Sequence, residues 1–128
     1  MDKREFKQGD VYIVDLNDAI GSEQSKIRPC LVVSRNTLNK NRPNIIVASI
    51  TGETRKKGLI SHYYLFKDKY AWLTRKTNIV LLECIRDVST SRVERYIGSI
   101  DKEDMDKILE LIIYDFKEPR WQTFCNML

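Results

Sequence analysis

The sequence predicts an α+β domain that combines a small, strongly curved antiparallel barrel or sheet with one helix near the C-terminus. Three observations support this. The length of 128 residues is that of one domain. Short runs rich in Val and Ile recur up to about residue 100, each as long as a strand. Beyond them, residues 101–118 repeat their apolar side chains at helical spacing.

Six segments have the pattern of β-strands. After Gly9, apolar side chains alternate with others as far as Asp15, and the later runs are β-branched. The segment 16–29 is longer than a hairpin requires, which is common where a loop carries function. The expected strands cover residues 11–15, 30–34, 44–51, 59–66, 78–85 and 93–100.

One helix is expected between Asp101 and Pro119. Asp101 has the character of an N-cap, with Asp104 three residues later, and Pro119 ends the pattern. The ordinary role of its apolar stripe is to seal the open side of the sheet. The stripe consists of Met105, Ile108, Leu109, Ile112, Ile113 and Phe116.

The composition is that of a soluble globular protein, with 42% hydrophobic and 31% charged residues. No apolar stretch approaches the roughly 18 residues that cross a bilayer. The first five residues include basic side chains but no apolar segment follows them, so they do not resemble a secretory signal. We therefore expect a cytoplasmic protein without membrane contact.

The cysteines and the histidine predict neither a disulfide nor a metal site. Cys30, Cys84 and Cys125 form no CxxC pair, and His62 is the only histidine. Cys30 and Cys84 lie in apolar runs, where a buried, inert thiol is the usual state. No metal or cofactor is expected.

The charge is distributed unevenly. Residues 101–118 hold seven acidic and three basic side chains, so they carry −4 and the rest of the chain carries +8 within the net charge of +4. The cationic side chains gather in loops, which suits a polyanionic partner. Loop charges that only keep the protein soluble explain each cluster equally well. The clusters are Arg35, Lys40 and Arg42, then Arg55, Lys56 and Lys57, and finally Arg75 and Lys76.

A loop at residues 21–29 has a composition that folding alone does not require. It places Glu23 and Gln24 shortly before Arg28, and a β-branched run that ends at Thr51 follows. Guanidinium matches phosphate oxygens bidentately and keeps its charge at all ordinary pH values. This arrangement indicates a site that handles phosphate.

With these residues, the chain resembles the MazF/PemK family of toxin endoribonucleases from about residue 8 to 115. The motifs are GDVY at 9–12, GSEQ at 21–24 with RP at 28–29, IIVASIT at 45–51 and VLLECIR at 80–86. The resemblance implies one domain over residues 1–128, with an SH3-like antiparallel β-barrel of the CcdB/PemK kind, a C-terminal helix and a homodimeric assembly. Residues 119–128 lie beyond it, as a C-terminal extension of unassigned role.

The resemblance also implies the activity. It predicts a metal-independent, sequence-specific endoribonuclease that cleaves single-stranded mRNA and acts as the toxin of a toxin–antitoxin pair. The 2′-hydroxyl of RNA is the nucleophile, and the products are a 2′,3′-cyclic phosphate and a 5′-hydroxyl. The expected protein partner is an antitoxin whose acidic, extended segment lies over the RNA groove.

Three residues match catalytic positions of that family. Arg28 suits charge stabilisation, since its pKa above about 12 makes it a poor base. Thr51 can donate to a phosphate oxygen or orient the 2′-hydroxyl. Glu23 either accepts a proton or holds Arg28 by an ion pair, and the sequence does not separate these roles.

Further residues are expected to contact RNA or to support the site. Base-reading contacts are expected from loops 35–43 and 52–58. Glu83 and Arg86 are expected to form a buried or interfacial ion pair, with contact to the substrate as the alternative, and His62 to be a hydrogen-bonded structural residue. The predicted RNA-binding set is Ser22, Gln24, Lys26, Ser49, Arg55, Lys56 and Lys57.

Two other functions remain open from the sequence. A binding toxin of the same fold, such as a DNA gyrase inhibitor, does not need the pair Arg28 and Thr51. A nucleic-acid-binding domain without catalysis gives binding that falls steeply with salt, but no cleavage.

Overall fold

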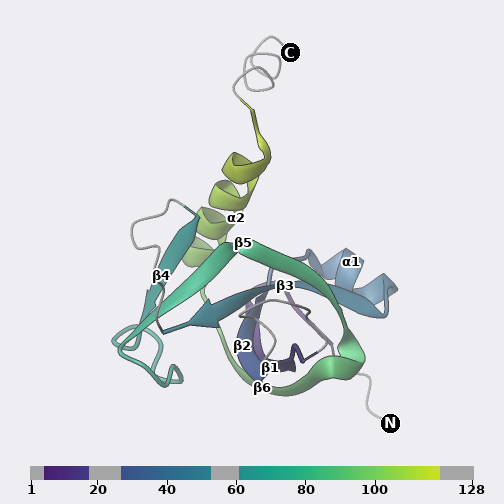
Figure 1. Ribbon diagram of the computed structural model, residues 1–128, viewed down its shortest axis with the longest axis horizontal. Helices are drawn as coiled ribbons and strands as arrows, with labels where there is room; N and C mark the ends of the chain where they lie inside the picture. The colour runs from purple at the N-terminus through teal and green to yellow at the C-terminus, as the bar shows by residue number, and fades with distance from the viewer. Residues whose placement is uncertain (1–4, 18–26, 53–60, 119–128) are drawn as a thin grey trace.

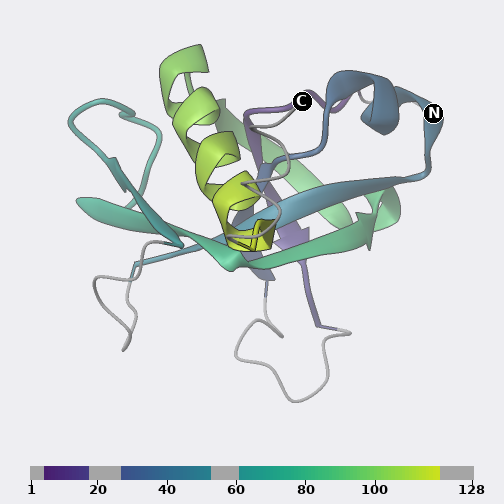
Figure 2. The ribbon, with the colours of Figure 1, turned by 90° about the horizontal axis from the view of Figure 1, so that it is seen from above.

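The computed structural model describes residues 5–17, 27–52 and 61–118. In this part of the chain, six antiparallel strands form one curved sheet in the order β4-β5-β3-β2-β1-β6, with helix α2 across one face (Figures 1 and 2). The predicted combination of an antiparallel sheet with a C-terminal helix is confirmed. The elements are β1 (Asp10–Asp15), β2 (Ile27–Val32), α1 (Asn36–Asn41), β3 (Asn44–Thr51), β4 (His62–Phe66), β5 (Thr77–Ser89), a 3₁₀ turn (Thr90–Arg92), β6 (Val93–Ser99) and α2 (Lys102–Phe116).

Strand β3 has the predicted bounds, whereas β2 begins earlier than expected. Ile27 pairs with Asp15 of β1, so β2 includes Arg28 and Pro29, which the sequence had placed in a loop. The regular pairing of β2 with β3 starts only at Cys30. Pro29 has no N–H to donate, which fits the absence of ladder pairing to β3 at this end.

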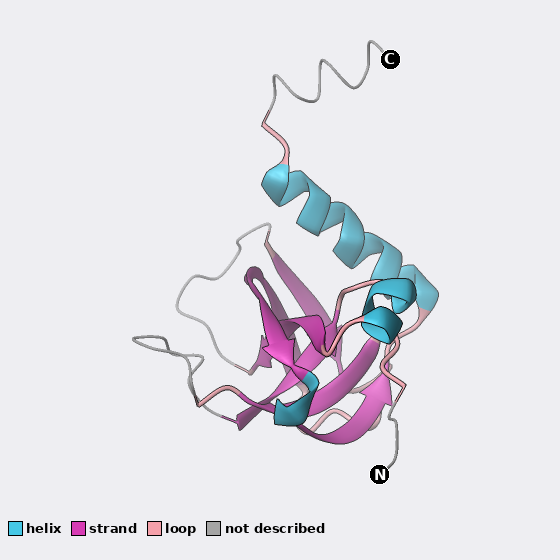
Figure 3. Ribbon diagram, turned by 90° about the vertical axis from the view of Figure 1, so that its right-hand side faces the viewer, coloured by secondary structure: helices cyan, strands magenta, loops and turns pink. Residues whose placement is uncertain are grey.

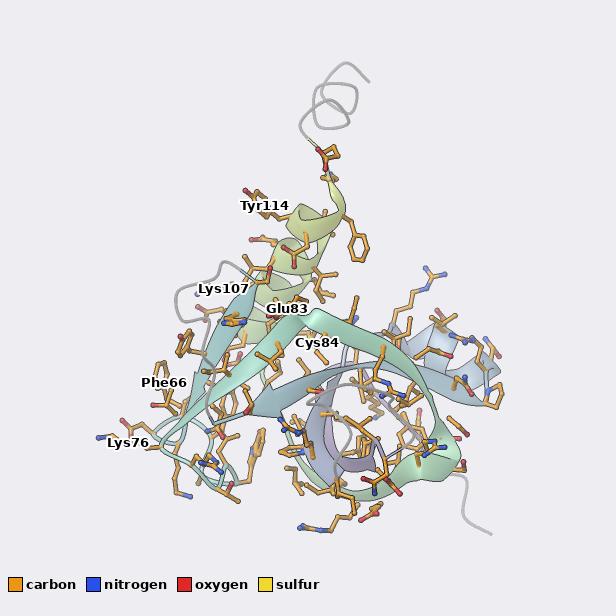
Figure 4. All side chains as sticks on the ribbon, in the orientation of Figure 1. Phe66, Lys76, Glu83, Cys84, Lys107 and Tyr114 are labelled. Atoms are coloured by element: carbon orange, nitrogen blue, oxygen red, sulfur yellow. The ribbon has the colours of Figure 1, made fainter. Side chains whose placement is uncertain are left out.

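Strand β5 is longer than predicted and bends in its middle. Its first half pairs with β4 on one side and with the end of β3 on the other, and its second half pairs with β3, so it continues to Ser89 rather than ending at Ile85. Val80 faces Ile50 and Ile85 faces Ala48, so residues 81–84 stand against Ser49 alone. Extra residues of this kind bend a strand and re-aim its side chains. Figure 4 shows Glu83 and Cys84 at the bend.

Helix α1 was not predicted, and it occupies most of the segment 35–43 that was expected to be a base-reading loop. Its sequence, NTLNKN, offers no apolar stripe. The helix is held instead by the buried Asn39, whose Nδ2 donates to the carbonyl of Ser34 over 2.9 Å and whose Oδ1 accepts from the Ser34 hydroxyl.

The sheet has an apolar core on each face. One core lies between the sheet and α2, where Met105 and Ile108 pack against strand residues such as Leu31 and Val80. The other is enclosed by the curvature of the sheet and includes Val14, Cys30 and Val47. Burying a large aliphatic side chain contributes about 1.5–3 kcal/mol, so both faces stabilise the domain. The C-terminal end of α2 projects past the strands (Figure 3).

A polar cluster fixes the start of α2, and the predicted N-cap is confirmed. The Asp101 carboxylate accepts from the Asp104 N–H over 2.9 Å. The Asp104 carboxylate in turn accepts from the hydroxyls of Tyr63 and Tyr70 and from Nζ of Lys69. Burial opposes ionisation of Asp104, but these three donors outweigh it and lower the pKa of the carboxyl. The cluster therefore joins the helix to β4 and to the hairpin that follows.

None of the helices in the described ranges has the length and apolar character needed to span a membrane.

Candidate functional site

The register of β2 and β3 directs Arg28 and Thr51 toward the same end of the sheet. Cys30 faces Ser49, Leu31 faces Ala48 and Val32 faces Val47. Continuing this one-to-one register by two residues places Arg28 opposite Thr51. Residues opposite each other on antiparallel strands share a face and lie about 4.5–5.5 Å apart at Cβ. On this extended register, two residues 23 positions apart in the chain share one face near the end of β3.

Ser49 lies on the same face, two residues before Thr51. Its side chain is 1% exposed, and its hydroxyl lies close enough to the Cys30 thiol to lower the pKa of that thiol by a hydrogen bond, but it has no oxygen or nitrogen partner among the described residues. A hydroxyl whose one neighbour is a weak thiol partner keeps the capacity to bond another polar group.

The thiol of Cys30 shows which charges surround this point. Burial raises its pKa to about 12, while Ser49, Arg86 and Arg28 lower it by smaller amounts. The thiol is thus inert, as predicted, and both guanidinium groups lie close enough to act on it. Two cations and a buried hydroxyl therefore surround the end of the inner core.

Arg86 is the member of this site that the sequence did not predict. It lies opposite Val47 of β3, so it shares the face of Ser49 rather than that of α2. The strand bend at residues 81–84 puts Arg86 in this position. The local signal in the sequence was its position after an apolar run, and this position favoured an ion pair with Glu83.

Glu83 does not pair with Arg86 within this chain. Its Oε2 lies 2.8 Å from Nε2 of His62, whose side chain is fully buried. Residues three apart on a strand point to opposite faces, and the bend separates them further. The buried form of the expected pairing is therefore not observed within this chain, and the interfacial form stays a prediction, whereas the structural role expected for His62 agrees with its burial and its bond. In the described part of the chain, Nδ1 of His62 has no partner.

The basic side chains of the cluster at residues 35–42 have ordinary surroundings. Arg42 forms an ion pair with Asp87 at 3.0 Å. Arg35 and Lys40 are exposed on or beside α1. These residues fit the interpretation of solvated or paired loop charges better than that of a binding site.

Several predicted site residues lie outside the described residues. They are Glu23, Ser22, Gln24 and Lys26, then Arg55, Lys56 and Lys57, together with the extension 119–128. In sequence, the first group directly precedes β2 and the second begins shortly after Thr51. Among residues 5–17, 27–52 and 61–118, no three His, Cys, Asp or Glu side chains gather in a group that could hold a metal ion.

Comparisons with known proteins point to one family. The family model of PemK-like, MazF-like toxins of type II toxin–antitoxin systems matches residues 7–114. Endoribonuclease EndoA of Bacillus subtilis is 37% identical over 106 residues, which cover 83% of this chain and 90% of that protein. Endoribonuclease MazF of Staphylococcus saprophyticus is 35% identical over 103 residues, covering 80% and 84% respectively.

Solved structures show the same fold. A mycobacterial endoribonuclease in complex with its cognate antitoxin has a TM-score of 0.68 at 20% identity, over 88% of this chain and 98% of that one. The curved antiparallel sheet with its C-terminal helix is thus the fold of known toxins. The chain belongs to the family of PemK-like, MazF-like toxins of type II toxin–antitoxin systems. The resemblance seen in the sequence motifs is confirmed.

Proposed function

We propose that this toxin is an endoribonuclease that cleaves single-stranded mRNA at specific sequences without a metal ion. The register of β2 and β3 supports this proposal, because its continuation by two residues from Cys30 and Ser49 sets Arg28 against Thr51. The names of two relatives that cover most of the chain, EndoA and MazF, support the reaction class. A reaction on mRNA places the protein in the cytoplasm.

The proposed reaction uses the nucleophile that RNA itself supplies. The 2′-oxygen forms a bond to phosphorus and loses its proton, while the bond from phosphorus to the 5′-oxygen breaks and that oxygen gains a proton. The products are a 2′,3′-cyclic phosphate and a 5′-hydroxyl. The protein has to align the two oxygens in line and to stabilise the added negative charge.

Arg28 is assigned to charge stabilisation. Its guanidinium stays protonated at every working pH and can hold two phosphate oxygens at once. Arg86 is a second cation on the same face and strengthens the positive potential there. Removal of one donor to such a charge typically slows a reaction by about 10²–10³-fold.

Thr51 is assigned to a hydrogen bond with a phosphate oxygen or with the 2′-hydroxyl, and Ser49 supports it from the buried side of the strand. Glu23 either accepts the proton of the 2′-hydroxyl or positions Arg28 by an ion pair. Since Arg28 is too weak a base for proton removal, a carboxylate is the chemically suitable acceptor.

RNA binding is assigned to polar and basic groups of the two segments that adjoin the site in sequence. Backbone contacts come from the cationic groups and base contacts from the amide and hydroxyl. These residues are Ser22, Gln24, Lys26, Arg55, Lys56 and Lys57.

We propose a homodimer and a cognate antitoxin as partners. The mycobacterial structure with its antitoxin supports the second. The positive charge outside residues 101–118 suits an acidic, extended antitoxin segment that competes with RNA for the same surface. Gyrase inhibition is the less favoured function, since the two sequence relatives are both endoribonucleases.

The decisive experiment treats mixed RNA with the purified protein in excess EDTA and maps the 5′ ends of the fragments. The proposal predicts cleavage at one short motif and 5′ ends that accept phosphate from polynucleotide kinase. Intact RNA together with inhibited gyrase supercoiling overturns it. Cleavage that EDTA abolishes removes the metal-independent mechanism.

A further inference from the structure

Strand β4 exposes two aromatic rings to solvent. Tyr64 and Phe66 lie two residues apart, so they share one face of the strand, and they are 37% and 49% exposed. Their ring centroids are 6.5 Å apart and their planes differ by only 22°. β4 is an edge strand, and Figure 4 shows Phe66 on its outer side. The two rings thus offer nearly parallel flat faces to whatever binds there.

The register connects these rings to the proposed cleavage site. Tyr64 faces Ile79 of β5, and Ile79 faces Thr51 of β3, so the three side chains form a row across the sheet on one face. Two strand spacings separate Tyr64 from Thr51, a distance of about 10 Å. This is within reach of the nucleotides that flank a phosphate held at Thr51.

The charge around the rings favours a polyanion. The turn that joins β4 to β5 carries Lys67, Arg75 and Lys76, and none of the three has an ion pair with the described residues. Lys67 donates only to backbone carbonyls, those of Ala71 and Leu73. Figure 4 shows Lys76 at the same end of the sheet as Phe66.

A second group of exposed apolar residues provides a contrast. Ile113, Tyr114 and Phe116 are 51–73% exposed at the end of α2, but they lie in the segment that carries −4. Aromatic rings among cations stack nucleic-acid bases, whereas the same rings on an acidic helix repel the backbone. The charge around them therefore makes the β4 rings, and not those at the end of α2, suitable for binding nucleic acid.

We propose that Tyr64 and Phe66 form a stacking platform for bases of the RNA strand next to the scissile phosphate. The platform rests on the proposed ribonuclease function and extends its binding site across β5 to the edge of the sheet. Stacking tolerates every base, so it holds the strand in place while other groups read the sequence.

The test compares cleavage of a short RNA that contains the mapped motif. Each stacked base is worth a factor of about 5- to 150-fold in binding, so Tyr64→Ala and Phe66→Ala are expected to raise KM by that order and to leave kcat nearly unchanged. Tyr64→Phe retains the ring and is expected to keep the original KM. Phe66→Leu keeps apolar area without a flat face and is expected to behave as Phe66→Ala does. Tyr114→Ala is the matched control on the acidic helix, with no expected effect.

Abasic substrates identify the stacked nucleotide. When the base that stacks is removed from the RNA, the unaltered protein loses affinity, and Phe66→Ala causes no further loss on that substrate. Equal KM values for all variants on the complete RNA overturn the platform while leaving the ribonuclease function in place. Light scattering on the same samples gives a second check, because a fall in mass for Phe66→Ala shows that another copy of the chain covers the rings.

If the unaltered protein cleaves nothing, the proposed function fails. The platform is then tested by the binding of a short RNA of mixed sequence. If the unaltered protein binds this RNA more tightly than Phe66→Ala does, the platform is supported without the ribonuclease function. Equal binding by the two proteins, or no binding, overturns the platform together with that function.

Discussion

The two faces of the sheet treat their polar groups differently. On the face that α2 covers, Asp104 accepts from two tyrosine hydroxyls and a lysine, so its charge is fully used by the fold. On the other face, Ser49 is buried beside the Cys30 thiol with no oxygen or nitrogen partner among the described residues, in the vicinity of two guanidinium groups. Polar groups on the first face hold the domain together, and those on the second are the ones that we propose to contact RNA.

The largest expected effect comes from Arg28→Ala. Loss of the cation opposite Thr51 is expected to reduce kcat on RNA by about 10²–10³-fold with little change in thermal stability. Cleavage rates on an RNA that contains the mapped motif, together with the melting temperature, check this. The matched control is Arg42→Ala, which removes an arginine that is paired with Asp87 and is expected to keep full activity. Full activity of Arg28→Ala contradicts the functional role of this face.

On the opposite face, Asp104→Ala is expected to lower the free energy of unfolding by about 2–3 kcal/mol. The substitution leaves the hydroxyls of Tyr63 and Tyr70 without their acceptor in a largely buried position. Urea unfolding measures the change. Asp106→Ala, which loses only an exposed i,i+4 ion pair with Lys102, is the control and is expected to cost at most about 0.5 kcal/mol. If both variants lose similar free energies of unfolding, the Asp104 cluster stabilises the fold no more than an exposed ion pair does.

Ser49→Ala sharpens the comparison, because it removes a hydroxyl whose one neighbouring partner in the described residues is the weakly bonding Cys30 thiol. Deleting a buried hydroxyl with so weak a partner is expected to leave the free energy of unfolding unchanged or raise it by about 1 kcal/mol. Cleavage is expected to fall if the hydroxyl supports Thr51. Urea midpoints and rates measured on one sample test both statements. A loss of stability shows that the hydroxyl has a structural role after all.

The smallest effect is the pH dependence of the helix-capping cluster. Hydrogen bonds from Lys69 and from the Asp104 N–H lower the pKa of Asp101, and three donors lower that of Asp104 against the effect of burial. A carboxyl whose pKa is lower in the folded state than in the unfolded state contributes its full stabilisation above the unfolded pKa, which is near 3.8. This stabilisation is lost as the pH falls from there through the folded values.

Urea midpoints between pH 6 and pH 2.5 measure this loss. In Asp104→Asn, part of the dependence is expected to disappear, because the amide does not titrate. An unchanged pH profile in that variant excludes Asp104 as a source of the acid sensitivity.

Much of the fold follows from local patterns in the sequence. The β-branched run of β3 has a single interpretation, and the predicted cap at Asp101 matches the observed start of α2. Helix α1 was missed because it depends on one buried contact between Asn39 and Ser34 rather than on an apolar stripe. The start of β2 was missed because Arg28 and Pro29 have the character of loop residues, and only pairing with β1 makes them part of a strand.

The site was predictable only in part, for a related reason. Motif resemblance selected Arg28 and Thr51, and the register of two strands then placed them opposite each other. Arg86 and the pairing of Glu83 with His62 depend on the bend in β5, which arises from unequal pairing with β3. The exposure of Tyr64 and Phe66 depends on the edge position of β4. Such long-range features leave no local signal in the sequence.

A double-mutant cycle of Arg28→Ala and Thr51→Ala, measured as the rate of RNA cleavage, tests most directly whether the two residues form one site. Residues that act on the same reacting group are strongly non-additive. The double variant is therefore expected to cleave about as slowly as Arg28→Ala alone. If the rate reductions of the two single variants multiply in the double variant, as they do for independent positions, Arg28 and Thr51 do not form one site.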